Sequence, residues 1–429
     1  MKIFDDIVNT QFELFVKLRI FLVICRKKFM PNISEKAVQM PASPIRKLVP
    51  YAEAAKKRGI KIYHLNIGQP DLPTPPIFFE GIKKANISIL EYTHSAGNES
   101  YRKKLVEYYK RYNINVDYTD IIITVGGSEA IEIAMMTCFN PGDEIIIPEP
   151  FYANYIGFSR AADVVIKPVR SVIDNGFALP PISEFEKLIT NRTKGIMICN
   201  PSNPTGYLYT REELEALKKI VIKHNLFLLS DEVYREFCYD GRPYNSVMHL
   251  EDADEHIIML DSISKRYSAC GARIGALVSK NKVVMASALK FAQARLSPPT
   301  FGQIGAEAAL SLGQEYFDEV VKEYTERRNY VVNELNKIPG VRCPMPGGAF
   351  YCIAELPIDD ADKFCQWLLE KFNYQNQTVM LAPATGFYST SDAGKKEVRI
   401  AYVLKKEDLQ KAIECLKIAL QEYQNVIKK

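Results

Sequence analysis

The sequence lacks the local patterns of cysteine and histidine that usually mark a metal site. It contains no Cys-x-x-Cys pair, and its five histidines are scattered between positions 64 and 256. Zinc sites commonly show closely spaced thiolate and imidazole ligands. A zinc enzyme is therefore not expected. The nine cysteines are an odd number without regular spacing, which predicts that most of them are small, buried apolar groups.

Blocks of like charge are also missing. Lys and Arg together number 55 and Asp and Glu together number 51, which leaves a net charge of +4. A protein that binds nucleic acid is expected to carry one strongly basic face, so this balance does not favour a nucleic-acid partner. The hydrophobic fraction of 47% and the charged fraction of 25% are typical of a globular protein and do not indicate extended disorder.

The N-terminal region has no apolar run long enough to span a membrane. Phe15–Cys25 is apolar except for Lys17 and Arg19, whereas a transmembrane helix needs about 20 apolar residues. Acidic residues precede this stretch, which does not match a signal peptide. We therefore expect a cytoplasmic catalyst or binding protein without a membrane partner. Residues 1–29 are interpreted as an extension of unknown role, with a short amphipathic docking helix as the alternative.

What the sequence does contain is an alternation of strand-like and helical segments. A length of 429 residues predicts two or three domains at a prior of about 150 residues each. Short apolar runs separated by crossover helices are typical of a sheet that is buried on both faces. The pattern predicts an α/β fold with a doubly wound, mostly parallel sheet, whose strands lie near 121–125, 144–148, 164–166, 195–199, 226–230, 257–260 and 275–278.

The pattern changes after Pro299. One long helical stretch is predicted from about Gly302 through Leu335, and strand-like runs begin again within 341–355. These features predict a smaller α+β domain. No internal repeat or low-complexity linker interrupts the chain.

The most informative motif follows the apolar run at 257–260. It reads Ser262-Ile263-Ser264-Lys265 and is followed by Gly271-Ala272-Arg273-Ile274-Gly275. Ligands of such sheets bind outside the carboxyl ends of the strands. There the Lys265 amine could condense with an aldehyde while the two serine hydroxyls and the Arg273 guanidinium hold a phosphate. Taken alone, the motif is also compatible with an exposed loop.

Three other strand ends carry residues suited to the same crevice. Asn200–Gly206 contains the turn-forming residues Asn, Pro and Gly. Asp231 follows another apolar run. A carboxylate buried there requires a nearby cation, which suits a site that binds a charged ligand. The alternative is that Asp231 caps the start of a helix. Gly126-Gly127-Ser128 opens a predicted helix whose backbone N–H groups suit a phosphate. Each motif alone would also fit a plain turn or cap.

In this order along the chain, the motifs resemble those of the fold type I pyridoxal-phosphate enzymes, and specifically the class I aminotransferases. The resemblance covers about residues 41–402 and implies pyridoxal 5'-phosphate as cofactor and a large domain with a sheet of the seven-stranded type. The domains implied are an extension at 1–29, an N-terminal arm with part of the small domain at 30–75, a large cofactor-binding domain at 76–310 and a small domain at 311–429.

The resemblance implies a role for each residue that would contact the cofactor. Lys265 would bind it covalently and move a proton, and Asp231 would keep its pyridine nitrogen protonated. Asn203 and Tyr234 would donate to its phenolic oxygen, and Tyr152 would stack on its ring. Its phosphate would be bound by Gly127, Ser128, Ser262 and Arg273, with Ser264 as a weaker candidate, while Tyr92 and Ser297 would reach the phosphate of the neighbouring subunit in a homodimer with shared sites.

The same resemblance implies how a substrate is held. Arg399, in Glu397-Val398-Arg399-Ile400, would bind the α-carboxylate of the amino acid through two hydrogen bonds. Gly68 would approach that carboxylate with its backbone N–H, and Asn203 would also border the substrate. Plain structural roles for these residues are the alternatives.

The sequence gives weaker signals for the residues that would select the side chain of the substrate. Ile45 belongs to a segment that resembles the arm covering the site, where it would form an apolar wall. Arg295 could bind a distal carboxylate and favour aspartate or glutamate, with a structural or solvated arginine as the alternative. Some relatives that accept dicarboxylates carry a lysine where this chain has Ser128.

The implied reaction is a ping-pong transamination between an L-amino acid, with aspartate favoured, and 2-oxoglutarate. Two other readings stay open at this point. A pyridoxal-phosphate lyase acting on an amino acid uses the same anchor residues. A non-catalytic regulator that binds pyridoxal phosphate would need a DNA-binding module, for which residues 1–29 are too short.

Overall fold

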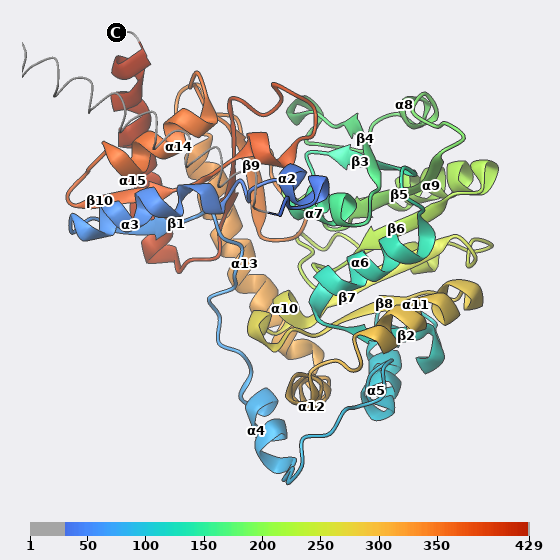
Figure 1. Ribbon diagram of the computed structural model, residues 1–429. Coiled ribbons are helices and arrows are strands. Elements are labelled where there is room, and N and C mark those ends of the chain that lie inside the picture. The colour runs from blue at the N-terminus through green and yellow to red at the C-terminus, as the bar shows by residue number, and fades with distance from the viewer. Residues whose placement is uncertain (1–30, 428–429) are drawn as a thin grey trace, which may run out of the picture. The chain divides into compact units, whose positions relative to one another are not determined.

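The computed structural model describes residues 31–427, and the chain separates into two units, Met1–Met40 and Pro41–Lys429. In the described part of the first unit, helix α2 (Glu35–Gln39) begins after Ser34, whose side chain accepts a hydrogen bond from the backbone N–H of Ala37. The predicted extension at 1–29 lies outside the described residues. All other elements belong to the second unit (Figure 1).

The main feature of the second unit is a seven-stranded sheet with the order β2-β8-β7-β6-β5-β3-β4. Only β8 runs against the others, because it pairs antiparallel with both β2 and β7. The predicted α/β fold with a mostly parallel sheet is therefore confirmed. The strands are β2 (Ile121–Thr124), β3 (Glu144–Glu149), β4 (Val165–Arg170), β5 (Thr193–Cys199), β6 (Phe227–Asp231), β7 (Ile257–Ser262) and β8 (Gly275–Val278).

Alternate residues of the central strands are buried on opposite faces of this sheet. In β3, Ile145 and Ile147 belong to one apolar cluster and Ile146 belongs to another. Because helices cover both faces, the central strands contain unbroken apolar runs, such as 145–147 in β3, rather than an alternating pattern. One cluster includes residues of α6 (Gly126–Cys138), α7 (Asn154–Ala161) and α11 (Lys282–Ala294), and the other includes residues of α5 (Glu99–Lys110), α9 (Arg211–His224) and α12 (Thr300–Ala309).

Two smaller sheets combine segments from both ends of the second unit. Strand β1 (Lys61–His64) pairs in parallel with β10 (Gln377–Met380). The other sheet has the order β11-β12-β9, with β12 (Glu397–Ala401) antiparallel to β9 (Tyr351–Glu355) and to β11 (Ala382–Pro383). Helices α3 (Val49–Lys57), α14 (Ala361–Glu370) and α15 (Lys406–Ile427) pack beside these strands (Figure 1).

These elements form the predicted smaller α+β part. The domain boundaries at residues 75 and 310 stay a prediction. The remaining short helices are α4 (Pro76–Lys84), α8 (Ile182–Glu186) and α10 (Ile263–Arg266). Among residues 31–427, no helix combines the length and the apolar character needed to cross a lipid bilayer.

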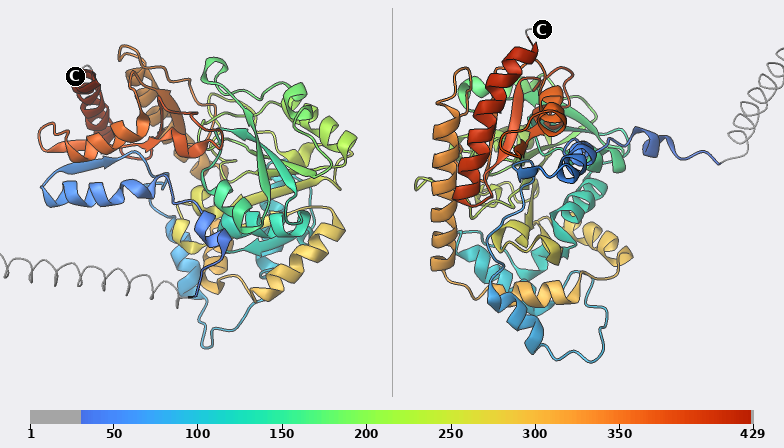
Figure 2. Two further views of the ribbon diagram at one scale, coloured as in Figure 1. Left: turned by 45° about the horizontal axis from the view of Figure 1, so that its top comes forward. Right: turned by 90° about the vertical axis from the view of Figure 1, so that its left-hand side faces the viewer.

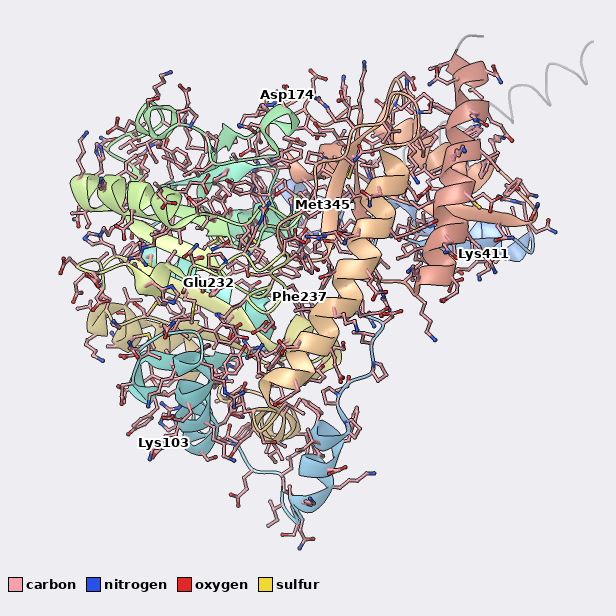
Figure 3. All side chains as sticks on the ribbon, turned by 180° about the vertical axis from the view of Figure 1, so that it is seen from behind. Lys103, Asp174, Glu232, Phe237, Met345 and Lys411 are labelled. Carbon is pink, nitrogen blue, oxygen red and sulfur yellow. The ribbon has the colours of Figure 1, made fainter. Side chains whose placement is uncertain are left out.

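The prediction of one long helical stretch from about Gly302 to Leu335 is wrong. The structure has two helices there, α12 and α13 (Gln314–Leu335), and Gly313 precedes the second with an extended backbone. Glycine is a poor helix former, and the apolar period that continues across it conceals the break in the sequence. Figure 2 shows α13 beside α15, and Figure 3 shows Phe237 next to α13, where its ring centroid lies 5.5 Å from that of Tyr324.

Candidate active site

A cavity of about 580 Å³ lies where the carboxyl ends of the parallel strands meet residues of the smaller sheets. Strands β2, β3, β5, β6 and β7 each lead directly into a segment that contributes to its lining. The structure brings most of the predicted site residues together in this lining: Ile45, Gly68, Gly127, Ser128, Tyr152, Asn203, Asp231, Tyr234, Ser262, Ser264, Lys265, Arg273 and Arg399.

Three predicted site residues lie outside this lining: Tyr92, Ser297 and Arg295. The contact of Ser297 with a neighbouring subunit stays a prediction. Tyr92 precedes α5 and is 78% exposed in the single chain, so its predicted contact with a neighbouring subunit stays a prediction. Arg295 follows α11, and its Nε lies 3.2 Å from a carboxylate oxygen of Glu129. Its Nη2 donates to the carbonyl oxygens of Ser95 at 3.3 Å and Ile123 at 3.1 Å. Acceptors of its own chain therefore hold Arg295.

Lys265 lies on α10, the one-turn helix directly after β7. Its Nζ donates to the carbonyl oxygen of Gly68 at 2.7 Å and lies 3.8 Å from the sulfur of Cys270. The Ser262 hydroxyl caps α10 by accepting the backbone N–H of Ser264 at 3.2 Å. Within residues 31–427 no carboxylate forms an ion pair with the lysine. When deprotonated, such an amine can react with an aldehyde.

Donors suited to an anion surround the start of α6. Gly126 has a positive φ of 75°, and a Cβ there would lie 2.3 Å from Nη2 of Arg273. Glycine thus allows the guanidinium to lie against the first turn of the helix. The hydroxyls of Ser262 and Ser264, 2.9 Å apart, and Gly127 line the same cavity. Together they supply the hydrogen bonds and positive charge that fit a phosphate.

Gly275, the first residue of β8, packs against this same turn. A Cβ there would lie 2.4 Å from the carbonyl carbon of Gly126 and 2.7 Å from the nitrogen of Gly127. Because both are backbone atoms, the start of α6 would have to move. We expect Gly275→Ala to lower stability by roughly 1–3 kcal/mol and to weaken the binding of a phosphate group at this turn about tenfold, as measured by urea denaturation and by titration with inorganic phosphate.

Gly271→Ala is the matched control, because nothing lies within 4 Å of a Cβ at that position. Equal effects of the two substitutions would contradict this explanation of Gly275.

Asp231 is the last residue of β6 and is buried. Its carboxylate accepts a hydrogen bond from the Tyr155 hydroxyl at 2.7 Å and a longer one from the N–H of Val233 at 3.4 Å. Burial raises the pKa of this carboxyl to about 6. No ion pair joins it to a cation among the described residues, and a turn rather than a helix follows it, so the alternative of a helix cap does not apply. A protonated ring nitrogen would supply the missing counter-charge.

Three polar side chains from different elements meet beside Asp231. The Asn203 side-chain nitrogen donates to the Tyr234 hydroxyl at 3.4 Å, and this hydroxyl lies 3.0 Å from the Tyr351 hydroxyl. Burial raises the pKa of Tyr234, which therefore stays a hydrogen-bond donor at neutral pH. Tyr351 lies outside every motif that the sequence offers for this site. Its only signal was its place within the strand-like runs at 341–355.

Arg399 lies in β12 and is 2% exposed. Its guanidinium carbon lies 4.5 Å from the ring centroid of Tyr351 and 4.8 Å from that of Phe387. The two Nη atoms donate to the Asn203 side-chain oxygen at 3.0 Å and to the Asn66 carbonyl oxygen at 2.6 Å, while Nε has no hydrogen-bond partner among the described residues. Burial lowers its pKa. A buried cation without a counter-ion fits a carboxylate ligand.

Tyr152 provides a flat wall of the cavity. Its ring packs edge-on against that of Tyr155, with centroids 5.4 Å apart, and its hydroxyl accepts a hydrogen bond from the Asn154 side chain at 2.8 Å. Burial raises the pKa of Tyr152 to about 12. The fixed aromatic face suits stacking against a planar ring.

Residues next to Asp231 and Lys265 form a completely buried ion cluster. Arg266 lies 2.5 Å from a carboxylate oxygen of Asp261 and 2.7 Å from one of Glu236. Arg235 lies 3.3 Å from Asp261 and 3.5 Å from Glu232, which Figure 3 labels. These ion pairs fix the segments that follow β6 and β7. Lys265 and Asp231 thus project from rigid backbone.

Comparisons with known proteins agree with this geometry. Residues 60–416 match the family model described as aminotransferase class I and II. An aspartate aminotransferase of Pyrococcus horikoshii is 32% identical over 404 residues, which cover 92% of this chain and 99% of that protein. The crystal structure of an aspartate aminotransferase from Thermotoga maritima matches with a TM-score of 0.83 and 29% identity, covering 91% of this chain and 100% of that one. An alanine aminotransferase structure from Pyrococcus furiosus matches with a TM-score of 0.84 and 30% identity, at the same coverage of 91% and 100%.

Proposed function

Because the chain belongs to the class I and II aminotransferase family, we propose that it binds pyridoxal 5'-phosphate and transfers the α-amino group of an L-amino acid, with aspartate favoured, to 2-oxoglutarate. The observation that carries the proposal is the shared cavity of Lys265, Arg273, Asp231 and Arg399. The names of similar proteins support aspartate, while the similar alanine aminotransferase has a monocarboxylic donor in its name.

The donor set of the cavity fits this cofactor. Bound pyridoxal phosphate would supply an electron sink for the charge left when the α-carbon of the amino acid loses its proton. Asp231 would keep the ring nitrogen protonated, and its buried carboxylate would gain the cation that it lacks. Asn203 and Tyr234 would donate to the phenolic oxygen, Tyr152 would stack on the ring, and Gly127, Ser128, Ser262, Ser264 and Arg273 would hold the phosphate.

Lys265 would act twice. It would first hold the cofactor covalently, and after the substrate amine has displaced it, its free amine would accept the proton from the α-carbon and pass it on. Arg399 and the backbone N–H of Gly68 would hold the α-carboxylate during this transfer. These two contacts would keep the α-carbon within reach of the lysine amine.

The proposal includes a homodimer in which Tyr92 and Ser297 reach the neighbouring site. Ile89, Leu90 and Tyr92 support it, because these large apolar side chains are 72%, 59% and 78% exposed in the single chain. Contiguous exposed apolar side chains mark an interaction surface. Light scattering on the purified protein should give twice the chain mass of 48.7 kDa.

The reaction type has a direct test. Purified enzyme incubated with aspartate alone should convert its cofactor to the pyridoxamine form and release one oxaloacetate per site, and 2-oxoglutarate should then restore the aldehyde form. Release of ammonia with the aldehyde form retained would instead show the elimination chemistry of a lyase. A panel of amino donors with 2-oxoglutarate would establish the preferred donor.

Arg399→Ala should weaken the binding of every amino acid and oxo acid, because all of them carry the carboxylate that Arg399 would hold. Loss of a buried charge pair predicts a decrease of about 2–5 kcal/mol in binding free energy, measured by titration of the cofactor spectrum. Amines without a carboxylate should react with the variant as they do with the wild type. A loss confined to one donor would contradict the assignment.

A further inference from the structure

The cavity contains a cation that the proposed function does not use. Its lining includes Arg46, Lys265, Arg273 and Arg399, and Asp231 is the only carboxylate in it within residues 31–427. In the proposed function, the lysine reacts, Arg273 holds the phosphate and Arg399 holds the α-carboxylate. Arg46 is left without an anion.

Arg46 begins the short helix η1 (Arg46–Leu48), and its backbone N–H donates to the Ser43 hydroxyl at 3.3 Å. Its guanidinium forms no ion pair and no hydrogen bond with any residue in the described part of the chain. Arg295, in contrast, is held by a carboxylate and two carbonyl oxygens. Of these two arginines, Arg46 is the one that borders the cavity with its hydrogen-bonding groups unused.

The segment around Arg46 is anchored on both sides. The Lys47 amine lies 2.5 Å from a carboxylate oxygen of Asp362, and the Leu48 side chain is 3% exposed. On the other side, Pro44 packs so closely on Gly386 that a Cβ on this glycine would lie 2.0 Å from the proline Cβ. These contacts fix the backbone at the cavity wall. The Arg46 side chain therefore projects from a fixed backbone position beside the cavity.

We propose that Arg46 binds the distal carboxylate of a dicarboxylic amino acid or oxo acid and so determines the substrate class of this site. The inference rests on the proposed function, in which Arg399 already holds the α-carboxylate. A guanidinium matches a carboxylate with two parallel hydrogen bonds. The neutral hydroxyl of Ser43 lines the same cavity and adds a donor for this group.

The exposed position of Arg46 suits a site that must accept more than one substrate. Water can solvate an exposed guanidinium when the bound molecule has no second carboxylate, so a monocarboxylic acid would lose an attraction without meeting a buried unpaired charge. Arg46 therefore gives a preference for dicarboxylic acids and does not exclude the others.

The test compares succinate with butyrate, which have equal chain length and differ by one carboxylate. Isothermal titration calorimetry on the cofactor-loaded enzyme should show succinate binding about 10- to 100-fold more tightly than butyrate. Arg46→Met should bring the ratio of the two affinities close to one, and Arg46→Lys should give an intermediate ratio. Both affinities are measured on the same variant. A general loss of folding or of cofactor affinity would therefore affect both equally and leave their ratio unchanged.

Lys47→Met is the matched control, since it removes a neighbouring cation outside the cavity and loosens η1 while keeping Arg46. It should change succinate and butyrate binding by equal factors. An unchanged ratio in Arg46→Met, or an equal loss of the ratio in Lys47→Met, would overturn the proposal.

Failure of the proposed function would give a different result. In that case pyridoxal phosphate would not bind, as seen directly from its absorbance, and the same titrations on the cofactor-free protein would still test the ratio. If the cofactor binds and amino donors convert it to the pyridoxamine form while Arg46→Met keeps the ratio, the inference alone fails.

Discussion

The Lys265→Ala variant is expected to transaminate more than about 10⁴-fold more slowly than the wild type, since it lacks the amine that, in the proposed function, holds the cofactor and moves the proton. Some pyridoxal phosphate should still bind without a covalent bond, through Arg273 and the first turn of α6. Borohydride reduction followed by mass spectrometry measures the covalent bond. In the wild type the cofactor mass should be found on the peptide that contains Lys265, and in the variant on no peptide.

Lys219→Ala is the control, because this lysine is exposed on α9 and does not line the cavity. It should keep both the activity and the covalent label. A label on another lysine of the Lys265→Ala protein, together with substantial activity, would disprove the assignment.

Asp231→Asn should retain the cofactor yet lose on the order of 10³-fold or more in the rate of proton transfer. A neutral amide cannot hold the ring nitrogen protonated, and the ring then accepts less negative charge. Stopped-flow measurement of the half-reaction with aspartate isolates this step. Turnover near the wild-type rate would contradict the role of the carboxylate.

The same substitution should stabilise the cofactor-free protein. Burial raises the pKa of Asp231 to about 6, from an ordinary value of 3.8, so the folded state binds a proton more tightly than the unfolded state. Stability therefore falls as the pH rises from about 4 to about 6, and above this range the charged carboxylate costs about 3 kcal/mol. The free energy of unfolding of cofactor-free Asp231→Asn should be higher than that of the wild type by this amount at pH 7. Near pH 4 the two values should be equal.

Urea denaturation at both pH values measures this difference. Asp318→Asn, which changes an exposed aspartate on α13, is the control and should show no such dependence on pH. If the wild type is as stable as Asp231→Asn at pH 7, the protein itself stabilises the charge of the buried carboxylate without the cofactor.

The large sheet could be predicted because its strands are unusual in composition. β3 and β5 are buried on both faces, and each contains an unbroken apolar run, at 145–147 and 196–199, with polar residues soon after it. The break before α13 could not be predicted in the same way. There the apolar period of 3.6 residues continues across Gly313, so the low helix propensity of one glycine is a weak local sign of the break.

The candidate site was predictable only where its residues follow strands in compact motifs. Asp231 ends such a strand and Lys265 follows one by three residues, and their neighbours carry the family's pattern. Tyr351 comes from a part of the chain that no local motif connects to the cavity, and the packing of β9 brings it there. Arg46 lies in the arm segment beside Ile45, but its sequence position alone does not show that its guanidinium has no partner among the described residues. For Arg295 the sequence left a substrate role and a structural role open, and its contact with Glu129 joins two segments that no local motif connects.

The buried ion cluster beneath Lys265 restricts how this part of the protein can evolve. Arg235, Arg266, Glu236 and Asp261 share their partners, so replacing any one of them leaves an uncompensated buried charge, at a cost of about 3–5 kcal/mol. That is a large fraction of the stability of a typical domain. Single substitutions here are expected to be eliminated by selection, and two distant segments of the chain can change only together. Descendants of this protein should therefore inherit positions 235, 236, 261 and 266 as one unit, even where their substrates diverge.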